Sequence, residues 1–169
     1  MRIAIVGPES TGKTALAQAL ATYHACPWVP EYARAYLARL GRPYALHDLA
    51  AIACGQQAAE DRLCDPRKPY LFCDTTPLVV QVWSEVKYGH CPAAIADLVQ
   101  PDRYALHLLT YPDLPWVYDP LRESEGQLLA LFDRYHAALD ATGLPFAVVC
   151  GVGRARLDAA LAALSLVAP

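Results

Sequence analysis

The chain has 169 residues, of which 55% are hydrophobic and 18% are charged, and its formal net charge at pH 7 is -3. This length suits a single domain over residues 1–169 with a sizeable core, and the composition excludes an intrinsically disordered chain. The mild net acidity and the lack of a dense basic block exclude a general nucleic-acid surface. We therefore expect a small-molecule partner and no nucleic acid.

The N-terminal residues and the cysteines indicate the cellular compartment of the protein. Residues 2–6 already have the apolar pattern of a strand, which leaves no room for a signal peptide, and no apolar run approaches the length that crosses a bilayer. The six cysteines include no C-x-x-C pair and are expected to be buried thiols. We expect a cytoplasmic protein without a membrane partner, and the sequence leaves its oligomeric state open.

A glycine-rich stretch follows the first strand. Residues 7–14 read GPESTGKT, which fits the pattern G-x-x-x-x-G-K-[ST], and apolar residues recur at helical spacing after it. Gly7 and Gly12 let the backbone approach an anion closely, and the helix that begins near Lys13 adds its free N–H groups and positive dipole end. Lys13 would reach the β- and γ-phosphates of a nucleoside triphosphate, and the Thr14 hydroxyl would ligate Mg²⁺. The predicted phosphate site comprises Gly7, Glu9, Ser10, Thr11, Gly12, Lys13 and Thr14.

Apolar runs with strand character alternate with amphipathic stretches along the whole chain. Strands are expected at 2–6, 26–30, 70–73, 104–109 and 146–150, and helices at about 13–23, 31–40, 46–63, 77–89, 93–99, 128–139 and 151–164. Five such strands separated by helices predict an α/β fold of three layers, with a five-stranded parallel sheet and helices on both faces. Residues 43–69 could form a helical cap beside the sheet, and the proline-rich, charged stretch at 111–125 predicts a mobile lid loop.

Ligands of such sheets bind outside the carboxyl ends of the strands, where three charged residues are expected. Asp74 could hold Mg²⁺ or accept the proton of an attacking hydroxyl, or it could simply cap the helix that starts at Pro77. Glu31 could reach a substrate hydroxyl or only favour the helix dipole. Arg122, in the lid loop, could neutralise charge on the transferred phosphoryl group or remain an exposed residue without a role.

One tryptophan also invites a functional interpretation. Trp28 lies in an extended segment between Pro27 and Pro30 and could offer its face to a flat ring. If that ring were cationic, cation–π attraction would contribute about 0.5–2 kcal/mol, with Glu31 nearby adding to it. Core packing is the alternative for Trp28.

Five sequence blocks together resemble the ribosylnicotinamide kinase domain of the NadR family. They are GPESTGKT at 7–14, EYAR at 31–34, GQQ at 55–57, FCDT at 72–75 and WVYDPLR at 116–122. The resemblance extends from Arg2 to about Leu161. The first block is shared by many NTPases, whereas the E-Y-x-R block, the aspartate-threonine pair and the W-V-x-D-x-L-R loop in this order are more specific.

This resemblance implies a P-loop kinase that transfers the γ-phosphate of ATP to the 5′-hydroxyl of nicotinamide riboside, giving nicotinamide mononucleotide for NAD salvage. It implies that Lys13 and Thr14 hold phosphates and Mg²⁺, that Asp74 or Glu31 is the base, and that Arg122 is a lid arginine on the ATP phosphates. Trp28 would stack on the pyridinium ring. The other implied nucleoside-binding residues are Glu31, Tyr32, Arg34, Gln57, Asp74 and Thr75.

Two features depart from the family pattern, and two other functions stay open. Bifunctional members carry an adenylyltransferase domain before the kinase, whereas this sequence starts in the first kinase strand, so we expect the reaction to stop at the mononucleotide. Trp28 and Glu31 are also further apart than in the tryptophan-glutamate-tyrosine run of some members. The alternatives are a kinase for another nucleoside or small alcohol, and a nucleotide-dependent ATPase or switch that phosphorylates nothing. A GTPase would usually show an N-K-x-D motif, which residues 110–113 do not provide.

Overall fold

Five parallel strands form the centre of the fold, in the order β2-β3-β1-β4-β5, in a computed structural model that describes residues 1–167. They are β1 (Arg2–Val6), β2 (Trp28–Val29), β3 (Leu71–Asp74), β4 (Leu106–Thr110) and β5 (Phe146–Val149). The predicted five-stranded parallel sheet is confirmed. Residues 168–169 of the predicted domain lie outside the described residues.

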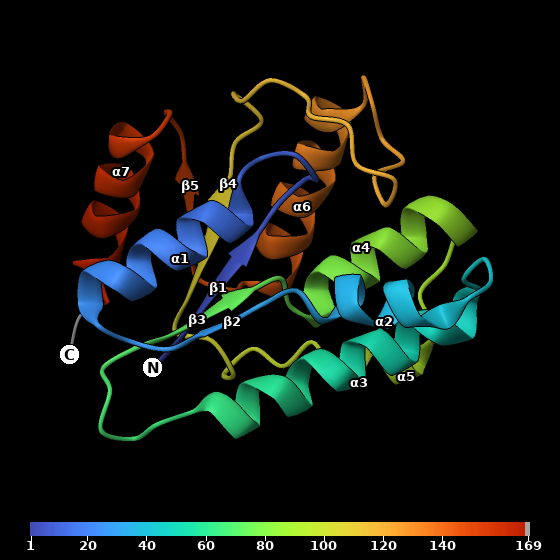
Figure 1. The fold of residues 1–169 in the computed structure, drawn as a ribbon, viewed down its shortest axis with the longest axis horizontal. Helices are drawn as coiled ribbons and strands as arrows, with labels where there is room; N and C mark the ends of the chain where they lie inside the picture. Colours follow the sequence, from blue (N-terminus) through green and yellow to red (C-terminus); the bar gives the residue numbers. More distant parts are fainter. Residues whose placement is uncertain (168–169) are drawn as a thin grey trace.

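Helices cover both faces of this sheet (Figure 1). They are α1 (Lys13–His24), α2 (Tyr32–Leu40), α3 (Leu46–Leu63), α4 (Pro77–Tyr88), α5 (Ala93–Ala96), α6 (Leu128–Thr142) and α7 (Arg154–Leu164). α1 and α7 pack together on one face, and α4 and α6 pack together on the other. The sheet is therefore the middle of three layers.

The strand β1 shows why both faces need cover. Ile3 and Ile5 belong to the core beneath α1 and α7, whereas Ala4 and Val6 belong to the core beneath α4 and α6. All four are completely buried. Because successive side chains of a strand point to opposite faces, an apolar strand in the middle of a sheet requires helices on both sides.

A third group of buried side chains lies beside the sheet and joins α2 and α3 to α4 and α5 (Figure 1). Its members are Ala33, Leu49, Ile52, Ala53, Val80 and Ile95. The helix α3, which fills most of the stretch 43–69, therefore packs as a cap beside the sheet. This cap carries α2 and its N-terminus toward the carboxyl ends of the strands.

Several predicted boundaries differ from the structure by a few residues. The helix predicted at 93–99 ends at Ala96, because the chain continues in tighter i→i−3 turns ahead of Pro101. β4 extends to Thr110, one residue beyond its predicted end, because it pairs with β5 as well as with β1. Thr76 occupies the N-cap position of α4, but its side chain makes no capping hydrogen bond.

The cysteines are less buried than predicted. All six are free thiols, and Cys73 is buried, but Cys54, Cys64 and Cys150 are exposed. Cys150 lies just beyond the end of β5, so the strand pattern was extended one residue too far. Within residues 1–167, none of the helices is both long enough and apolar enough to span a bilayer.

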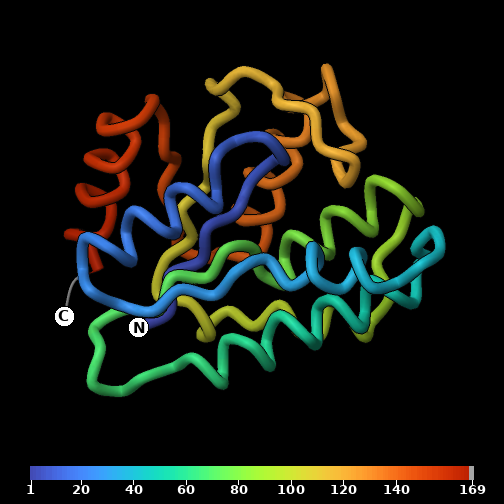
Figure 2. The backbone as a smooth tube through the Cα atoms, viewed as in Figure 1, coloured from blue at the N-terminus to red at the C-terminus, as the bar shows by residue number. Residues whose placement is uncertain are grey.

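Residues 111–127, called the lid segment below, connect β4 to α6 without a helix or a strand. This agrees with the loop predicted at 111–125. Figure 2 shows the segment, in yellow to orange, passing beside the loop that follows β1 and reaching toward the end of α4. The lid segment therefore lies over the carboxyl edge of the sheet.

Candidate active site

The loops after β1 and β4 meet at the carboxyl edge of the sheet. The register aligns Val6 with Leu109, so Gly7 lies against Thr110. Gly7 has a φ of 130°, and a Cβ atom there would lie 2.6 Å from Thr110 Oγ1. The Thr11 hydroxyl, in turn, is 2.7 Å from Thr110 Oγ1. Glycine is thus required at position 7 to let the loop pass close to β4.

The loop at residues 7–14, the P-loop, leaves its backbone donors free. The N–H groups of residues 10–14 donate to no acceptor within the described part of the chain. Gly12, with a φ of 77°, turns the chain into α1, which begins at Lys13. Buried backbone donors are normally paired, and several free ones converging at a helix N-terminus bind anions. The loop therefore has the geometry of a phosphate cradle.

Lys13 folds back over this cradle. Its Nζ donates to the carbonyls of Gly7 at 3.0 Å and Pro8 at 2.7 Å. Burial lowers the pKa of the Lys13 ammonium, and the carboxylates of Glu31, Asp74 and Glu9 oppose that change. The charged form is thus sustained by its anionic surroundings, and an anion in the cradle would stabilise it further.

Asp74 ends β3 beside the P-loop. The Thr14 hydroxyl donates to Asp74 Oδ2 at 2.5 Å, while Oδ1 is buried and has no hydrogen-bond partner among the described residues. Burial raises the pKa of Asp74 to about 6, although Lys13 nearby lowers it. A carboxylate oxygen without a partner next to a hydroxyl suits a hydrated Mg²⁺ ion, which takes few protein ligands. Within residues 1–167, no three His, Cys, Asp or Glu side chains gather as a metal site of their own.

Thr75, the next residue, has an unusual backbone. Its φ is 70°, and its N–H donates to the carbonyl of Ile5 at 3.0 Å. A β-branched residue in the left-handed region costs of order 1–3 kcal/mol and persists where its surroundings fix it. The strained turn carries the chain abruptly from β3 to α4 and keeps Asp74 at the P-loop.

A cavity of about 510 Å³ opens from the P-loop between α2, α4, α6 and the lid segment. Predicted site residues that line it are Gly7, Glu9, Ser10, Thr11, Gly12, Lys13, Thr14, Glu31, Arg34, Thr75 and Arg122. Further lining residues include Val79, Val82, Trp83, Val86, Lys87, Leu131 and Tyr135. One cavity thus brings together the predicted phosphate groups and most of the predicted acceptor groups.

Glu31 stands at the N-terminus of α2, in the wall of this cavity. Its Oε2 lies 3.3 Å from Arg34 Nε, and Arg34 Nη1 also pairs with Asp119 of the lid segment at 2.8 Å. The Glu31 side chain is 27% exposed. The carboxylate is therefore oriented by Arg34 but still accessible from the cavity.

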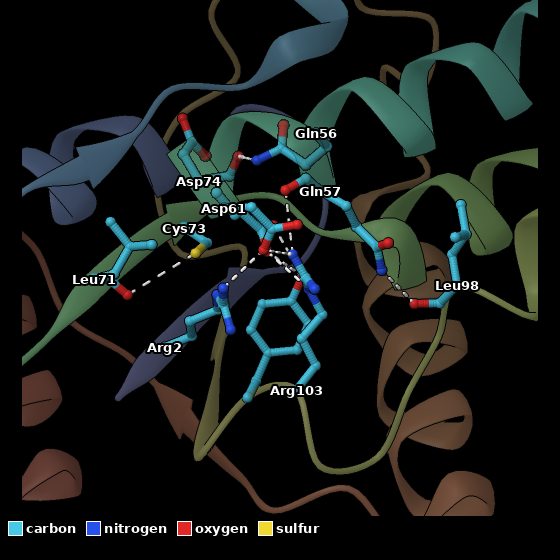
Figure 3. A network of polar contacts seen from close by, with 11 residues as sticks. Arg2, Gln56, Gln57, Asp61, Leu71, Cys73, Asp74, Leu98 and Arg103 are labelled. Carbon is cyan, nitrogen blue, oxygen red and sulfur yellow. Dashed lines mark hydrogen bonds and ion pairs between the residues drawn. The ribbon is translucent and has the colours of Figure 1, made fainter. Parts of the chain in front are cut away.

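Of the adjacent glutamines in α3, neither is among the residues that line the cavity, but Gln56 contacts the backbone of two predicted site residues (Figure 3). Its Oε1 accepts a hydrogen bond from the Tyr32 N–H at 2.9 Å, and its Nε2 lies 3.5 Å from the Asp74 carbonyl. Gln57 instead donates to the Leu98 carbonyl at 2.8 Å. Consecutive helical residues point about 100° apart. The sequence block alone could not show which glutamine faces the site, and the nucleoside role of Gln57 stays a prediction.

Two predicted aromatic contacts lie outside the cavity lining. Trp28 pairs with Phe72 in the sheet and packs against the core beneath α1 and α7. The Tyr32 ring lies over Gly55, where an added Cβ atom would be 2.1 Å from the ring. The packing of Trp28 favours the core alternative, and the substrate roles of Trp28 and Tyr32 stay predictions.

The lid segment is bonded directly to the P-loop. The Ser124 N–H donates to Glu9 Oε1 at 2.5 Å, and the Val117 N–H donates to Ser10 Oγ at 2.9 Å. Arg122 donates to the Val117 carbonyl and lies 3.3 Å from Ser10 Oγ. Its Nε is buried without a partner among the described residues. Arg122 is thus held beside the P-loop with its Nε–H group still available as a donor.

A polar cluster joins the lid segment to α4 at the far end of the cavity. Lys87 Nζ contacts Tyr44 Oη at 2.5 Å and both carboxylate oxygens of Glu123 at 2.9 Å. Trp83 Nε1 donates to the same Tyr44 oxygen at 3.0 Å. Trp83 lines the cavity and also packs against the group of buried side chains that joins α2 and α3 to α4 and α5.

Tyr135 is a second lining residue that the sequence pattern did not reveal. It is 5% exposed, and burial raises the pKa of its hydroxyl, with Glu31 and Glu9 adding to the effect. An aromatic residue at helical spacing in α6 looks like any core residue. The difference arises because α6 borders the cavity, and no local signal shows that.

A family model described as an AAA domain matches residues 2–156. No curated protein matches the chain.

Solved structures are similar over nearly the whole chain. NadR protein in complex with NR has a TM-score of 0.84 and 23% identity, and the match covers 99% of this chain and 51% of that one. NadR protein in complex with NAD and AMP-PNP gives 0.79 and 22%, covering 99% and 49%. Deoxyadenosine kinase from M. mycoides with products bound gives 0.64 and 12%, covering 98% and 100%. The chain spans about half the length of the NadR structures, and these likenesses show a shared P-loop kinase fold.

Proposed function

This chain belongs to the AAA domain family whose model it matches, and on that premise we propose that it is a kinase that transfers the γ-phosphate of ATP to the 5′-hydroxyl of nicotinamide riboside. The product would be nicotinamide mononucleotide. The observation that carries the proposal is a single cavity that holds a P-loop at one end and Glu31 with Arg34 in its wall, in a fold shared with NadR in complex with NR. Since the chain spans about half of NadR, the proposal covers this one reaction.

The free N–H groups of the P-loop and Lys13 would bind the ATP phosphates. Lys13 would exchange its two loop carbonyls for phosphate oxygens, which are stronger, charge-assisted partners. Thr14 and Asp74 would hold Mg²⁺, because Asp74 accepts from the Thr14 hydroxyl through Oδ2 and keeps Oδ1 without a partner. When bound, Mg²⁺ neutralises charge on the phosphoryl oxygens.

Two carboxylates could orient the acceptor hydroxyl. The pKa of Asp74 is raised to about 6, which brings it near the value that suits a general base, but its Oδ2 already accepts from Thr14. Glu31 is more accessible and lies in the cavity wall. Arg122, held on the P-loop by the lid segment, would stabilise charge on the transferred group.

The cavity wall combines apolar and aromatic surface with carboxylates that suit a flat cationic acceptor, although four basic side chains line the cavity as well. Val79, Val82 and Trp83 supply apolar and aromatic surface, and the carboxylates of Glu9 and Glu31 face the same space. Aromatic faces and carboxylates both attract a cationic ring. This combination supports nicotinamide riboside, whose pyridinium ring carries a positive charge.

The test is to incubate the protein with Mg²⁺-ATP and a panel of nucleosides that includes nicotinamide riboside, and to identify products by mass spectrometry. We expect a clear preference for nicotinamide riboside that is lost in Lys13→Ala and kept in Lys68→Ala, an exposed lysine remote from the P-loop. Phosphorylation of other nucleosides without nicotinamide riboside would overturn the acceptor assignment.

A kinase for another nucleoside is the second candidate, and the similarity to deoxyadenosine kinase favours it. The same panel separates the two, because a deoxynucleoside kinase would prefer a neutral base. ATP binding or hydrolysis without any phosphorylated nucleoside would instead indicate a nucleotide-dependent ATPase or switch.

A further inference from the structure

Arg156 occupies an unfavourable place for an arginine. It lies in the first turn of α7 and is 4% exposed. A cation at a helix N-terminus opposes the helix dipole, and a buried guanidinium is costly unless its donors are paired. The contacts of Arg156 must therefore account for its position.

Those contacts join three loops at the carboxyl edge of the sheet. Arg156 Nε donates to the Gly151 carbonyl at 2.7 Å, after β5, and Nη2 donates to the Tyr111 carbonyl at 3.0 Å, after β4. Nη2 also pairs with Asp113, whose other oxygen accepts the Gly151 N–H at 2.6 Å. Nη1 donates to the carbonyl of Thr11 in the P-loop. The guanidinium thus bridges the loops after β1, β4 and β5.

The Thr11 contact bears on phosphate binding. In a trans peptide the C=O and the following N–H point in opposite directions. A Thr11 carbonyl held toward Arg156 therefore turns the N–H of Gly12 away from Arg156, toward the cavity that Gly12 lines. That N–H is one of the free donors of the P-loop.

We propose that Arg156 is a positioning residue that keeps the P-loop in its phosphate-binding form by holding the Thr11 carbonyl. Glycine at position 12 tolerates either orientation of the preceding peptide. Without Arg156 the Thr11–Gly12 peptide is free to rotate and to turn a carbonyl, which repels phosphate, into the cradle. The inference rests on the proposed nucleotide binding and is independent of the identity of the acceptor.

The test compares Arg156→Met with Arg154→Met as a matched control. Arg154 is in the same helical turn, but its side chain is 76% exposed and pairs with Asp158. The dissociation constants of a fluorescent ATP analogue and of inorganic tripolyphosphate are measured with Mg²⁺, the second by competition. We expect Arg156→Met to weaken both by roughly tenfold or more, the loss typical of one hydrogen bond to a charged group. Arg154→Met should leave both within about twofold, as surface changes usually do.

The Gly12 amide proton is a direct reporter of the mechanism. In ¹⁵N-labelled protein we expect this resonance to move downfield on ADP binding in the native chain and in Arg154→Met, but much less in Arg156→Met. If Arg156 only stabilised the fold, Arg156→Met would lower the melting temperature and leave this shift intact. If Arg156→Met does not fold, Asp113→Asn, which removes the ion pair and keeps the guanidinium, should show the same losses to a smaller degree.

Two results would overturn the inference. One is unchanged tripolyphosphate affinity in Arg156→Met, or in Asp113→Asn where that variant replaces it. The other is a Gly12 shift equal to that of the native chain. Failure of the native protein to bind either probe would overturn the proposed function as well, so the two failures are distinguishable.

Discussion

The two ends of the cavity are built in different ways. The phosphate half, made of the P-loop with Asp74, uses mainly backbone N–H groups from one continuous stretch of chain. The acceptor half uses side chains from α2, α4, α6 and the lid segment. A site made of backbone follows from local sequence, whereas a site made of side chains depends on how distant helices pack.

The two halves also differ in electrostatics. In the phosphate half, burial lowers the pKa of Lys13 and raises that of Asp74 to about 6. In the acceptor half, Glu31 is partly exposed and Glu123 is more exposed still. Charge in the phosphate half therefore depends on its partners, while charge in the acceptor half is also stabilised by water.

The largest expected effect concerns Asp74 in the phosphate half and Glu31 in the acceptor half. If Asp74 is the base, Asp74→Asn should lower kcat by on the order of 10²- to 10⁴-fold, and Glu31→Gln by much less. Because the Asp74 pKa is about 6 and ionisation is needed, native kcat/KM should fall as the pH drops below about 6. Glu31→Gln should keep this acidic limb, and Asp74→Asn should lose it. Rates close to native in both variants would show that neither carboxylate activates the hydroxyl.

The next largest effect concerns the packing of α2 on α3, which supports the acceptor half. Alanine normally favours a helix over glycine by about 1 kcal/mol, yet a Cβ atom at Gly55 would lie 2.1 Å from the Tyr32 ring. We expect Gly55→Ala to lower the free energy of unfolding by about 1–3 kcal/mol, as overpacking does. Ala58→Gly, at an exposed position of α3, measures the propensity alone. A stabilised Gly55→Ala in urea unfolding would contradict the packing of α2 on α3.

The smallest effect separates the roles of Trp28 and Trp83. Trp83 lines the cavity, and Trp28 packs against the core. We expect Trp83→Leu to raise KM for the acceptor by about 2- to 30-fold, the equivalent of a cation–π contact, without changing KM for ATP. Trp28→Leu should lower the melting temperature and leave both KM values unchanged. The reverse result would restore the stacking role of Trp28.

Much of the fold and of the phosphate half could be predicted from the sequence. Apolar strands alternating with helices carry a periodic signal, and residues 7–14 combine every functional group of their motif in one stretch. The acceptor half could be predicted only in part. Glu31 and Arg34 line the cavity, but Gln56 and Gln57 are indistinguishable until the rotation of α3 is known.

Side chains that act across long distances in the chain left no local signal. Trp83 and Tyr135 have the spacing of core residues, and their contact with the cavity depends on the placement of α4 and α6. Arg156 sits in an ordinary helical stretch, and its partners lie in three separate loops. Such residues can be recognised once the loops are placed in space.

The contact between Thr11 and Arg156 spans 145 positions of the chain. The P-loop therefore leaves the ribosome well before the side chain that holds its peptide. The first strand is likewise the middle strand of the sheet, and it has no neighbours until β3 and β4 are made. Tight nucleotide binding should therefore wait until α7 has been made and has docked, well after the P-loop itself has been made.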